Sequence, residues 1–174
     1  MATKLLSKAQ LDETLATMAR DVAASVPDAA PLALVGIRRR GEFLAQRLAP
    51  LLAQAGRKPE HQGVLDITLY RDDLTTIGPA AQVRGTEIEF DITGSWLVLV
   101  DDVLYTGRSV RAALDALTDL GRPRAIKLAV LVDRGWRELP IQPDYVGLKV
   151  KTNAENIVKV KLTEVDASDG VELV

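Results

Sequence analysis

The sequence predicts an open α/β fold in which helices cover both faces of a mainly parallel sheet. Short, nearly all-apolar runs are typical of strands buried on both faces of such a sheet. They alternate along the chain with longer stretches whose apolar residues recur at helical spacing. Two of the runs pass into a helical stretch at Gly36 and at Asp101. In open α/β sheets, such strand-to-helix connections are where ligands bind.

Length and composition narrow the class of protein. The chain has 174 residues, no cysteine, one histidine and a formal net charge of −2. This length suits one domain, residues 1–174, with a sizeable core. The absence of cysteine excludes thiol nucleophiles and redox pairs, and with a single histidine it excludes zinc fingers. The charge gives no overall basic field toward nucleic acid. No apolar run approaches the ~20 residues that span a bilayer, so we expect a cytoplasmic protein without a membrane partner.

The first elements are a helix and a buried strand. Ser7 and Gln10 have the spacing of a capping box. The apolar residues at 11–22 then follow one helical face, and the helix is expected to end near Pro27. The apolar run at 32–37 predicts the strand.

A second helix and an irregular region come next. The helix is expected at 43–56, with a kink or a break at Pro50 because proline removes one helical hydrogen bond. Alternation predicts strands at 64–70 and, as an edge strand, at 86–92. Between them, residues 71–85 have no periodicity, which is typical of a functional or disordered loop.

The rest of the chain is expected to add one helix and four strands. The helix carries its apolar face from Val110 to Leu120 and is ended by Gly121 and Pro123. The strands are expected at 96–100, 126–132, 145–150 and 157–162.

The strongest functional signal is one segment at the end of a buried strand. It consists of Val98, Leu99, Val100, Asp101, Asp102, Val103, Leu104, Tyr105, Thr106, Gly107, Arg108, Ser109 and Val110. Free N–H groups at the start of the following helix, with the hydroxyls of Thr106 and Ser109, would hold a phosphate monoester, and Gly107 would let the backbone approach it. Asp101 and Asp102 would accept hydrogen bonds from two sugar hydroxyls. For the acidic pair alone, two solvated carboxylates remain an equal alternative.

This segment resembles the phosphoribosyl-pyrophosphate (PRPP) motif of type I phosphoribosyltransferases. Within that class, the chain resembles the PyrR family of pyrimidine-operon regulators with uracil phosphoribosyltransferase activity. The resemblance rests on residues 34–41, 66–74, 98–110 and 131–140, and the stretch Asp-Ile-Thr-Leu-Tyr-Arg-Asp-Asp-Leu at 66–74 is specific to that family. It implies the type I phosphoribosyltransferase fold with a flexible hood loop at about 71–85.

The resemblance also implies a role for each candidate site residue. The ribose hydroxyls would bind Asp101 and Asp102, and the 5′-phosphate would bind Thr106, Gly107, Arg108 and Ser109. The diphosphate would contact Arg39, Arg40 and Arg84. The base would lie near Tyr105, Asp133, Arg134, Ile157 and Val158. Mg²⁺ would bind through PRPP and diphosphate, with no direct protein ligand for the metal.

Tyr105 bears on which base is used. Purine transferases of this class commonly have an aspartate at that position, and a phenol is not a strong base at neutral pH. The implied reaction is uracil with PRPP giving UMP and diphosphate, with weak turnover. Transfer to a purine or another base remains open, as does a sensor of UMP or UTP that turns over little substrate.

Departures from the family pattern concern RNA binding. Trp136, Gln142 and Leu148 stand where relatives typically carry His, Arg and Lys. Possible RNA contacts are Arg20, Trp136 and Arg137, with Trp136 stacking on an unpaired base. Fewer cations predict weaker binding to a pyr mRNA leader, and loss of that binding is an alternative. Four lysines could rebuild a basic face: Lys149, Lys151, Lys159 and Lys161. A homodimer is expected.

Overall fold

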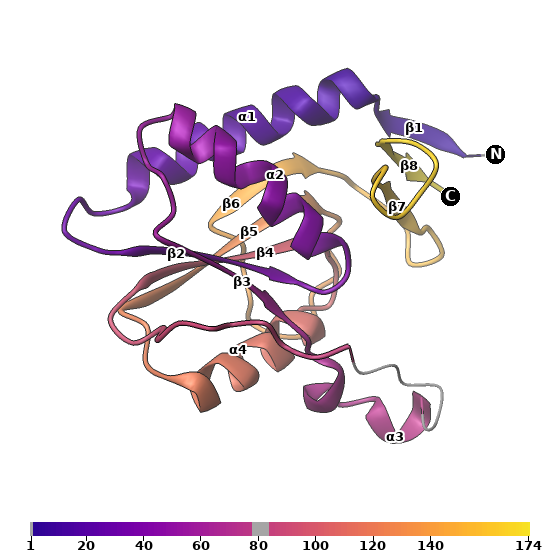
Figure 1. The fold of residues 1–174 in the computed structure, drawn as a ribbon. Coiled ribbons are helices and arrows are strands. Elements are labelled where there is room, and N and C mark those ends of the chain that lie inside the picture. The colour runs from indigo at the N-terminus through magenta and orange to yellow at the C-terminus, as the bar shows by residue number, and fades with distance from the viewer. Residues whose placement is uncertain (1, 78–83) are drawn as a thin grey trace.

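Five parallel strands form the main sheet in the order β3-β2-β4-β5-β6 (Figure 1). The computed structural model describes residues 2–77 and 84–174. The strands are β2 Leu32–Ile37, β3 His61–Leu65, β4 Trp96–Leu104, β5 Ala125–Asp133 and β6 Tyr145–Lys149. The chain moves from β2 to β3 on one side and returns to β4 on the other. The crevice between β2 and β4 is therefore the topological switch point, where open α/β sheets bind ligands.

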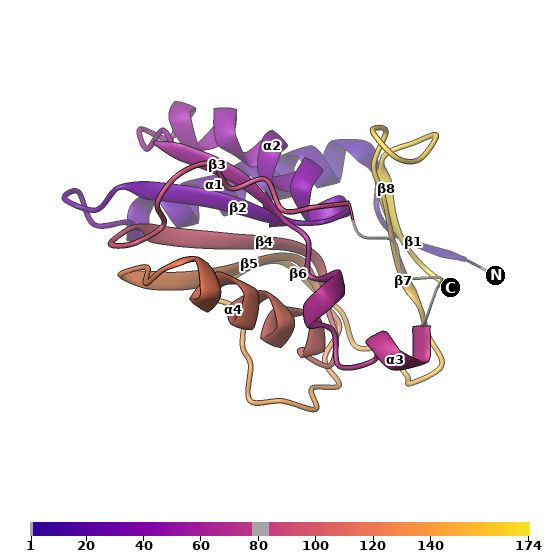
Figure 2. The same cartoon turned by 60° about the horizontal axis from the view of Figure 1, so that its bottom comes forward.

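Helices cover both faces of the main sheet, as predicted. Helices α1 (Lys8–Ser25) and α2 (Arg40–Gln54) lie on one face, and α4 (Arg108–Leu120) lies on the other (Figures 1 and 2). One apolar cluster fills each layer. The capping box of α1 is present, because Gln10 N–H donates to the Ser7 hydroxyl at 3.3 Å and Ser7 N–H donates to the Gln10 side chain at 2.9 Å.

Both ends of the chain meet in a small antiparallel sheet. Its strands are β1 Thr3–Leu6, β8 Gly170–Leu173 and β7 Val158–Lys161, in the order β1-β8-β7. This small sheet stands at one end of the main sheet, the end where the short helix α3 (Leu74–Ile77) lies (Figure 2). The sequence predicted β7 but neither β1 nor β8.

Two predicted strands are wrong. The strand expected at 64–70 ends at Leu65 and is followed by a 3-10 turn, η1 (Thr68–Tyr70). The Asp66 carboxylate accepts from the Thr68 backbone and hydroxyl at 2.9 and 2.6 Å, and this local turn replaces the strand ladder. The edge strand expected at 86–92 is reduced to one bridge between Val64 and Glu87. Its alternating apolar residues pack against the core without a ladder.

Other boundaries differ less. Helix α2 runs without a break through Pro50, and Leu48 and Leu52 on either side of it are buried in the core. Strand β4 continues past the predicted end to Leu104, which places the acidic pair inside the strand. Helix α4 ends before Gly121 as expected. In the part of the chain described, no helix has the length and apolarity to cross a membrane.

Candidate active site

The acidic pair lies near the carboxyl end of β4. Asp101 is buried at 8% exposure, and Asp102, on the opposite side of the strand, is partly exposed. The Asp102 N–H donates to the Asp101 carboxylate at 2.9 Å, and the Val103 N–H donates to the Asp102 carboxylate at 2.9 Å. Burial, followed by the neighbouring charge of Asp102, raises the pKa of Asp101 well above its ordinary value. The partly exposed Asp102 is the more accessible of the two acceptors for a ligand.

The loop after β4 has the geometry of a phosphate site. Gly107 caps α4 with φ +93°, a conformation that glycine adopts without steric cost. The Thr106 hydroxyl accepts from the Arg108 N–H at 3.3 Å, so the chain turns tightly into the helix. Backbone N–H groups in the first turn of α4 favour an anion. The Arg108 side chain forms ion pairs with Glu138 at 2.8 Å and Asp72 at 2.7 Å, which leaves the backbone and Ser109 to meet a phosphate.

A cavity of about 320 Å³ lies at the switch point between β2 and β4. Its charged lining residues are Arg38, Arg39, Arg40, Arg71, Arg84, Asp66, Asp101 and Asp102, with Ser109 at the phosphate loop. Five guanidinium groups against three carboxylates favour a polyanionic ligand such as a diphosphate. All three arginines predicted to bind diphosphate and both predicted ribose carboxylates therefore line one cavity.

Of the three arginines after β2, Arg38 fastens a neighbouring segment, whereas Arg39 and Arg40 have side chains that a ligand in the cavity could reach. Arg38 donates to the Gly85 carbonyl at 2.9 Å and pairs with Glu87 at 2.9 Å, which fastens the segment after Arg84 to the β2–α2 turn. Arg39 is exposed and lines the cavity. Arg40 lines the cavity and binds Asp166 through Nη2 at 3.1 Å.

Asp66 holds the base of the predicted hood loop, a role that the sequence did not reveal. Its carboxylate accepts from the backbone N–H groups of Arg84 at 2.6 Å and Gly85 at 2.9 Å, besides its bonds from Thr68. Burial opposes ionisation, but these hydrogen bonds lower the pKa of Asp66 overall. The Asp-x-Thr spacing is the signal that could have suggested the turn. Of the hood at 71–85, residues 78–83 lie outside the described part of the chain.

A second group of predicted residues gathers around Tyr105. The Arg134 guanidinium lies 3.9 Å from the centre of the Tyr105 ring and donates to the carbonyls of Asn156 and Asn153 at 2.7 and 3.1 Å. Ile157 follows Asn156 and is 55% exposed, whereas Val158 is buried in the core. In this arrangement Arg134 connects Tyr105 to the chain segment that carries Ile157.

The remaining predicted residues are Asp133, expected near the base, and the three possible RNA contacts. Asp133 accepts from the Gly135 N–H at 3.0 Å and pairs with Arg137 at 2.8 Å. Arg137 also donates to the carbonyls of Ile141 at 2.9 Å and Tyr105 at 3.0 Å, so its guanidinium is used inside the protein. Trp136 is 52% exposed. Arg20, on α1, is exposed, and its guanidinium donates to the Thr17 hydroxyl at 3.1 Å.

A parallel sheet with an acidic pair, a phosphate loop and an arginine-rich turn at its switch point defines the class of phosphoribosyltransferases. Residues 4–168 match the family model described as "Phosphoribosyl transferase domain". Among solved structures, the chain is similar to hypoxanthine phosphoribosyltransferase from Trypanosoma cruzi, with TM-score 0.76, 19% identity, and 98% and 94% of the two chains covered. It is also similar to a hypoxanthine-guanine phosphoribosyltransferase from Bacillus anthracis, with TM-score 0.73, 19% identity, and 99% and 98% covered. At these identities the likeness establishes the fold.

Sequence relatives narrow the family. The chain is 56% identical over 170 residues to the protein named "Bifunctional protein PyrR" of Thermus aquaticus, covering 98% of this chain and 94% of that protein. It is 50% identical over 169 residues to the protein of the same name from Deinococcus radiodurans, covering 97% and 92%. The chain therefore belongs to the PyrR family of phosphoribosyltransferases, as the resemblance in the sequence predicted.

Proposed function

We propose that this chain is a uridine-nucleotide-responsive regulator of pyrimidine genes that also transfers the phosphoribosyl group of PRPP to uracil, giving UMP and diphosphate. One observation carries the proposal. One cavity brings together the acidic pair of β4, Ser109 at the start of α4 and the arginines that follow β2, and Ser109 also lines the adjoining pocket with Thr106 and Arg108 of the phosphate loop. These are the three kinds of group that PRPP requires at its ribose, its 5′-phosphate and its diphosphate.

In the proposed reaction, the bond from ribose C1′ to the diphosphate oxygen breaks and a bond from C1′ to uracil N1 forms. The N1 proton leaves and the diphosphate carries away the electron pair of the broken bond. Arg39, Arg40 and Arg84 would stabilise the departing charge, and Asp102 with Asp101 would hold the ribose hydroxyls. The residue expected near uracil that could accept the N1 proton is Tyr105, and a phenol is not a strong proton acceptor at neutral pH. Positioning and charge stabilisation would then supply most of the rate.

We expect Mg²⁺ to bind at this site together with PRPP. In residues 2–77 and 84–174, no three histidine or acidic side chains gather as a metal site. Mg²⁺ commonly binds through one or two carboxylates together with substrate phosphates. PRPP would therefore supply most of its oxygen ligands, with Asp102 as the accessible carboxylate nearby. Bound there, the ion would neutralise charge that develops on the diphosphate.

The reaction is tested by incubating the protein with PRPP, Mg²⁺ and one base at a time. Uracil is expected to give UMP, whereas hypoxanthine and guanine should give little product. The alternative of purine transfer predicts the opposite order. A protein that forms no nucleotide from any base, yet binds UMP, would instead be a sensor without the enzyme activity.

Base selection would depend on the Tyr105–Arg134 pair. The guanidinium over the ring fixes the phenol, and the nearby carbonyls of Asn153 and Asn156 fix the guanidinium. Arg134→Lys keeps the charge but cannot reproduce both the guanidinium contact with the ring and the hydrogen bonds to two carbonyls. We expect it to raise KM for uracil while leaving KM for PRPP within about twofold of the native value.

For regulation, we propose binding to a pyr leader RNA with few phosphate contacts. Trp136 presents a half-exposed indole whose Nε1–H donates to the Thr152 carbonyl at 2.8 Å, so the ring is held in place for stacking. Arg137 is used internally, and Lys161 pairs with Glu172 at 2.8 Å. The remaining exposed cations include Arg20, Lys149, Lys151 and Lys159.

Filter binding across a salt series separates stacking from phosphate contact. Trp136→Ala should weaken binding without changing the slope of log affinity against log salt, because stacking releases no counterions. Trp136→Phe is the matched control and should retain most of the affinity. Binding that is nanomolar and stimulated by UMP, with a steep salt slope, would show that the lysines have rebuilt a basic face. We further propose that the protein is cytoplasmic and that it forms a homodimer. Sedimentation checks the dimer.

A further inference from the structure

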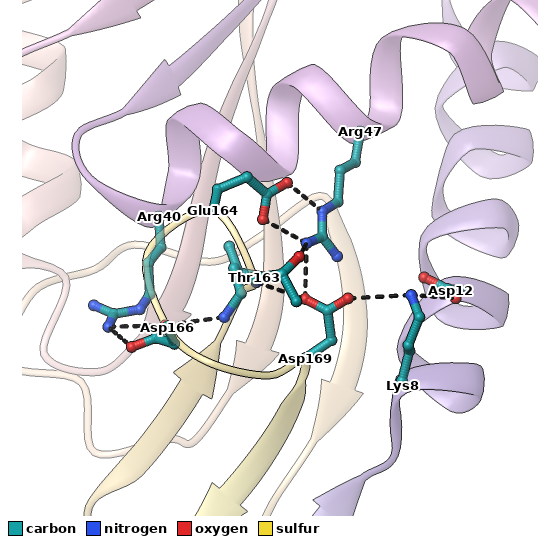
Figure 3. Close-up of polar contacts among 9 residues, drawn as sticks. Lys8, Asp12, Arg40, Arg47, Thr163, Glu164, Asp166 and Asp169 are labelled. Carbon is teal, nitrogen blue, oxygen red and sulfur yellow. Dashed lines mark hydrogen bonds and ion pairs between the residues drawn. The ribbon is translucent and has the colours of Figure 1, made fainter.

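Arg40 of the diphosphate site is held by a carboxylate from the far end of the chain. Its Nη2 lies 3.1 and 3.3 Å from the two carboxylate oxygens of Asp166, in the loop between β7 and β8 (Figure 3). Among the residues described, Asp166 is the only hydrogen-bond partner of this guanidinium. We propose that Asp166 is a positioning residue for the reaction, which orients Arg40 toward the diphosphate of PRPP. This inference rests on the proposed function of the cavity.

The loop that carries Asp166 is fixed independently of Arg40. Arg47, two helical turns after Arg40 on α2, pairs with Glu164 at 2.8 Å and with Asp169 at 2.8 Å (Figure 3). Asp169 is nearly buried, with 2% of its side chain exposed, and also binds Lys8 of α1 at 3.2 Å. The loop is therefore fastened to both helices that cover one face of the main sheet.

Within the loop, the Asp166 carboxylate has its own support. One oxygen accepts from the Leu162 N–H at 2.9 Å, and the Asp166 N–H donates back to the Leu162 carbonyl at 2.6 Å. Burial opposes ionisation, but the Leu162 N–H and Arg40 lower the pKa of Asp166 overall, so the group is anionic at neutral pH. The anion is thus set in place by the backbone, and Arg40 adjusts to it.

This arrangement matters because Arg40 is a long side chain at the mouth of the cavity. It is about one-third exposed, at 32%, and without a partner it would sample many rotamers that PRPP would have to restrict on binding. The pair with Asp166 restricts them in advance. Nη2 donates to the carboxylate and Nε is buried without a hydrogen-bond partner among the described residues, so Nη1 is the nitrogen left to meet the ligand.

The test is Asp166→Asn, because the amide oxygen can replace Oδ2, which accepts from the Leu162 N–H, whereas the NH₂ group in place of Oδ1 cannot accept from Arg40 and the negative charge is lost. We expect KM for PRPP, and the Kd of PRPP with Mg²⁺ measured by calorimetry, to rise roughly 3- to 10-fold, the cost of ordering one such side chain. The KM for uracil should stay within about twofold. Glu164→Gln is the matched control: it loosens the same loop at Arg47 and should lower thermal stability without changing PRPP affinity.

A double-mutant cycle decides whether Asp166 acts through Arg40. In an Arg40→Ala background, where no cation remains to pair with position 166, Asp166→Asn should have little further effect on PRPP affinity, whereas a merely structural effect would be the same in both backgrounds. Equal PRPP affinity of Asp166→Asn and the native protein, or additivity in the cycle, would overturn the inference. If the asparagine variant does not fold, Asp166→Glu takes its place in the cycle. Because calorimetry reads PRPP binding directly, absence of UMP formation would contradict the proposed activity without deciding the role of Asp166.

Discussion

Replacing Gly41 by alanine should separate the two sides of the proposed site. Gly41 follows Arg40 in the first turn of α2 and packs against β4 at the acidic pair. A Cβ there would lie 2.4 Å from the Val100 carbonyl oxygen and 3.2 Å from the Asp101 Cα. Both are backbone atoms that cannot rotate away, so the helix start and the strand must move apart by about 1 Å to reach an ordinary contact distance.

The expected loss of activity follows from the groups that α2 and β4 carry. The start of α2 carries the arginines expected at the diphosphate, and β4 carries the carboxylates expected at the ribose. A misplacement of about 1 Å between groups that hold one substrate can cost about 100-fold in rate. Overpacking of this kind also costs roughly 1–3 kcal/mol of stability. We therefore expect kcat/KM for PRPP to fall 10- to 100-fold in Gly41→Ala, measured as UMP formation below the thermal midpoint of the variant.

The control lies at the other end of the same helix. Gly56 follows α2 with φ +86°, and nothing lies within 4 Å of the place where its Cβ would be. Gly56→Ala should cost about 1–2 kcal/mol through its left-handed backbone alone. The two variants should thus lose similar stability, but only Gly41→Ala should lose activity. If kcat/KM of Gly41→Ala is within twofold of that of Gly56→Ala, the reasoning about this contact is wrong.

Three further predictions concern single carboxylates. Asp102→Asn should weaken PRPP binding about 10- to 100-fold by calorimetry with an unchanged circular dichroism spectrum, since one charged acceptor contributes ~1.5–3 kcal/mol; native affinity would argue against a ribose contact. Because burial and Asp102 raise the pKa of Asp101, its ionisation costs stability that grows as pH rises. Asp101→Asn should therefore raise Tm at pH 8, with a gain that disappears toward pH 4; a lower Tm at pH 8 would contradict this. Burial opposes ionisation of Asp169, but Arg47, the Thr163 N–H and Lys8 lower its pKa overall. Its contribution is complete above about pH 4 and is lost as pH falls further, so the Tm difference between the native protein and Asp169→Asn should shrink below pH 4.

Local patterns predicted the main sheet well. The apolar runs that became β2, β4 and β5 are buried along most of their length, and such runs are recognisable without knowledge of their partners. The small sheet was harder, because β1 and β8 have four residues each and pair across nearly the whole chain, with Lys4 opposite Glu172. A four-residue strand whose partner lies so far away leaves no local periodicity to read.

The same distinction applies to the site. The acidic pair and the phosphate loop are neighbours in sequence, and their backbone geometry follows from local residues such as Gly107. The pairing of Arg40 with Asp166 joins residues 126 positions apart, and the hydrogen bond from Arg84 to Asp66 spans 18. Those contacts depend on how the sheets are placed, which composition and spacing do not specify.

The distribution of charge in the cavity bears on how one site could serve both an enzyme and a sensor. The arginines gather where a diphosphate would lie, whereas the proposed ribose and 5′-phosphate contacts come from Asp102 and the start of α4. PRPP would use both regions, and UMP would use only the second, together with the base region near Tyr105. The two ligands then share the ribose-phosphate contacts and must exclude one another. We infer that occupancy by UMP rises with the ratio of UMP to PRPP. The same contacts that support transfer would then also make the bound nucleotide a measure of UMP relative to PRPP.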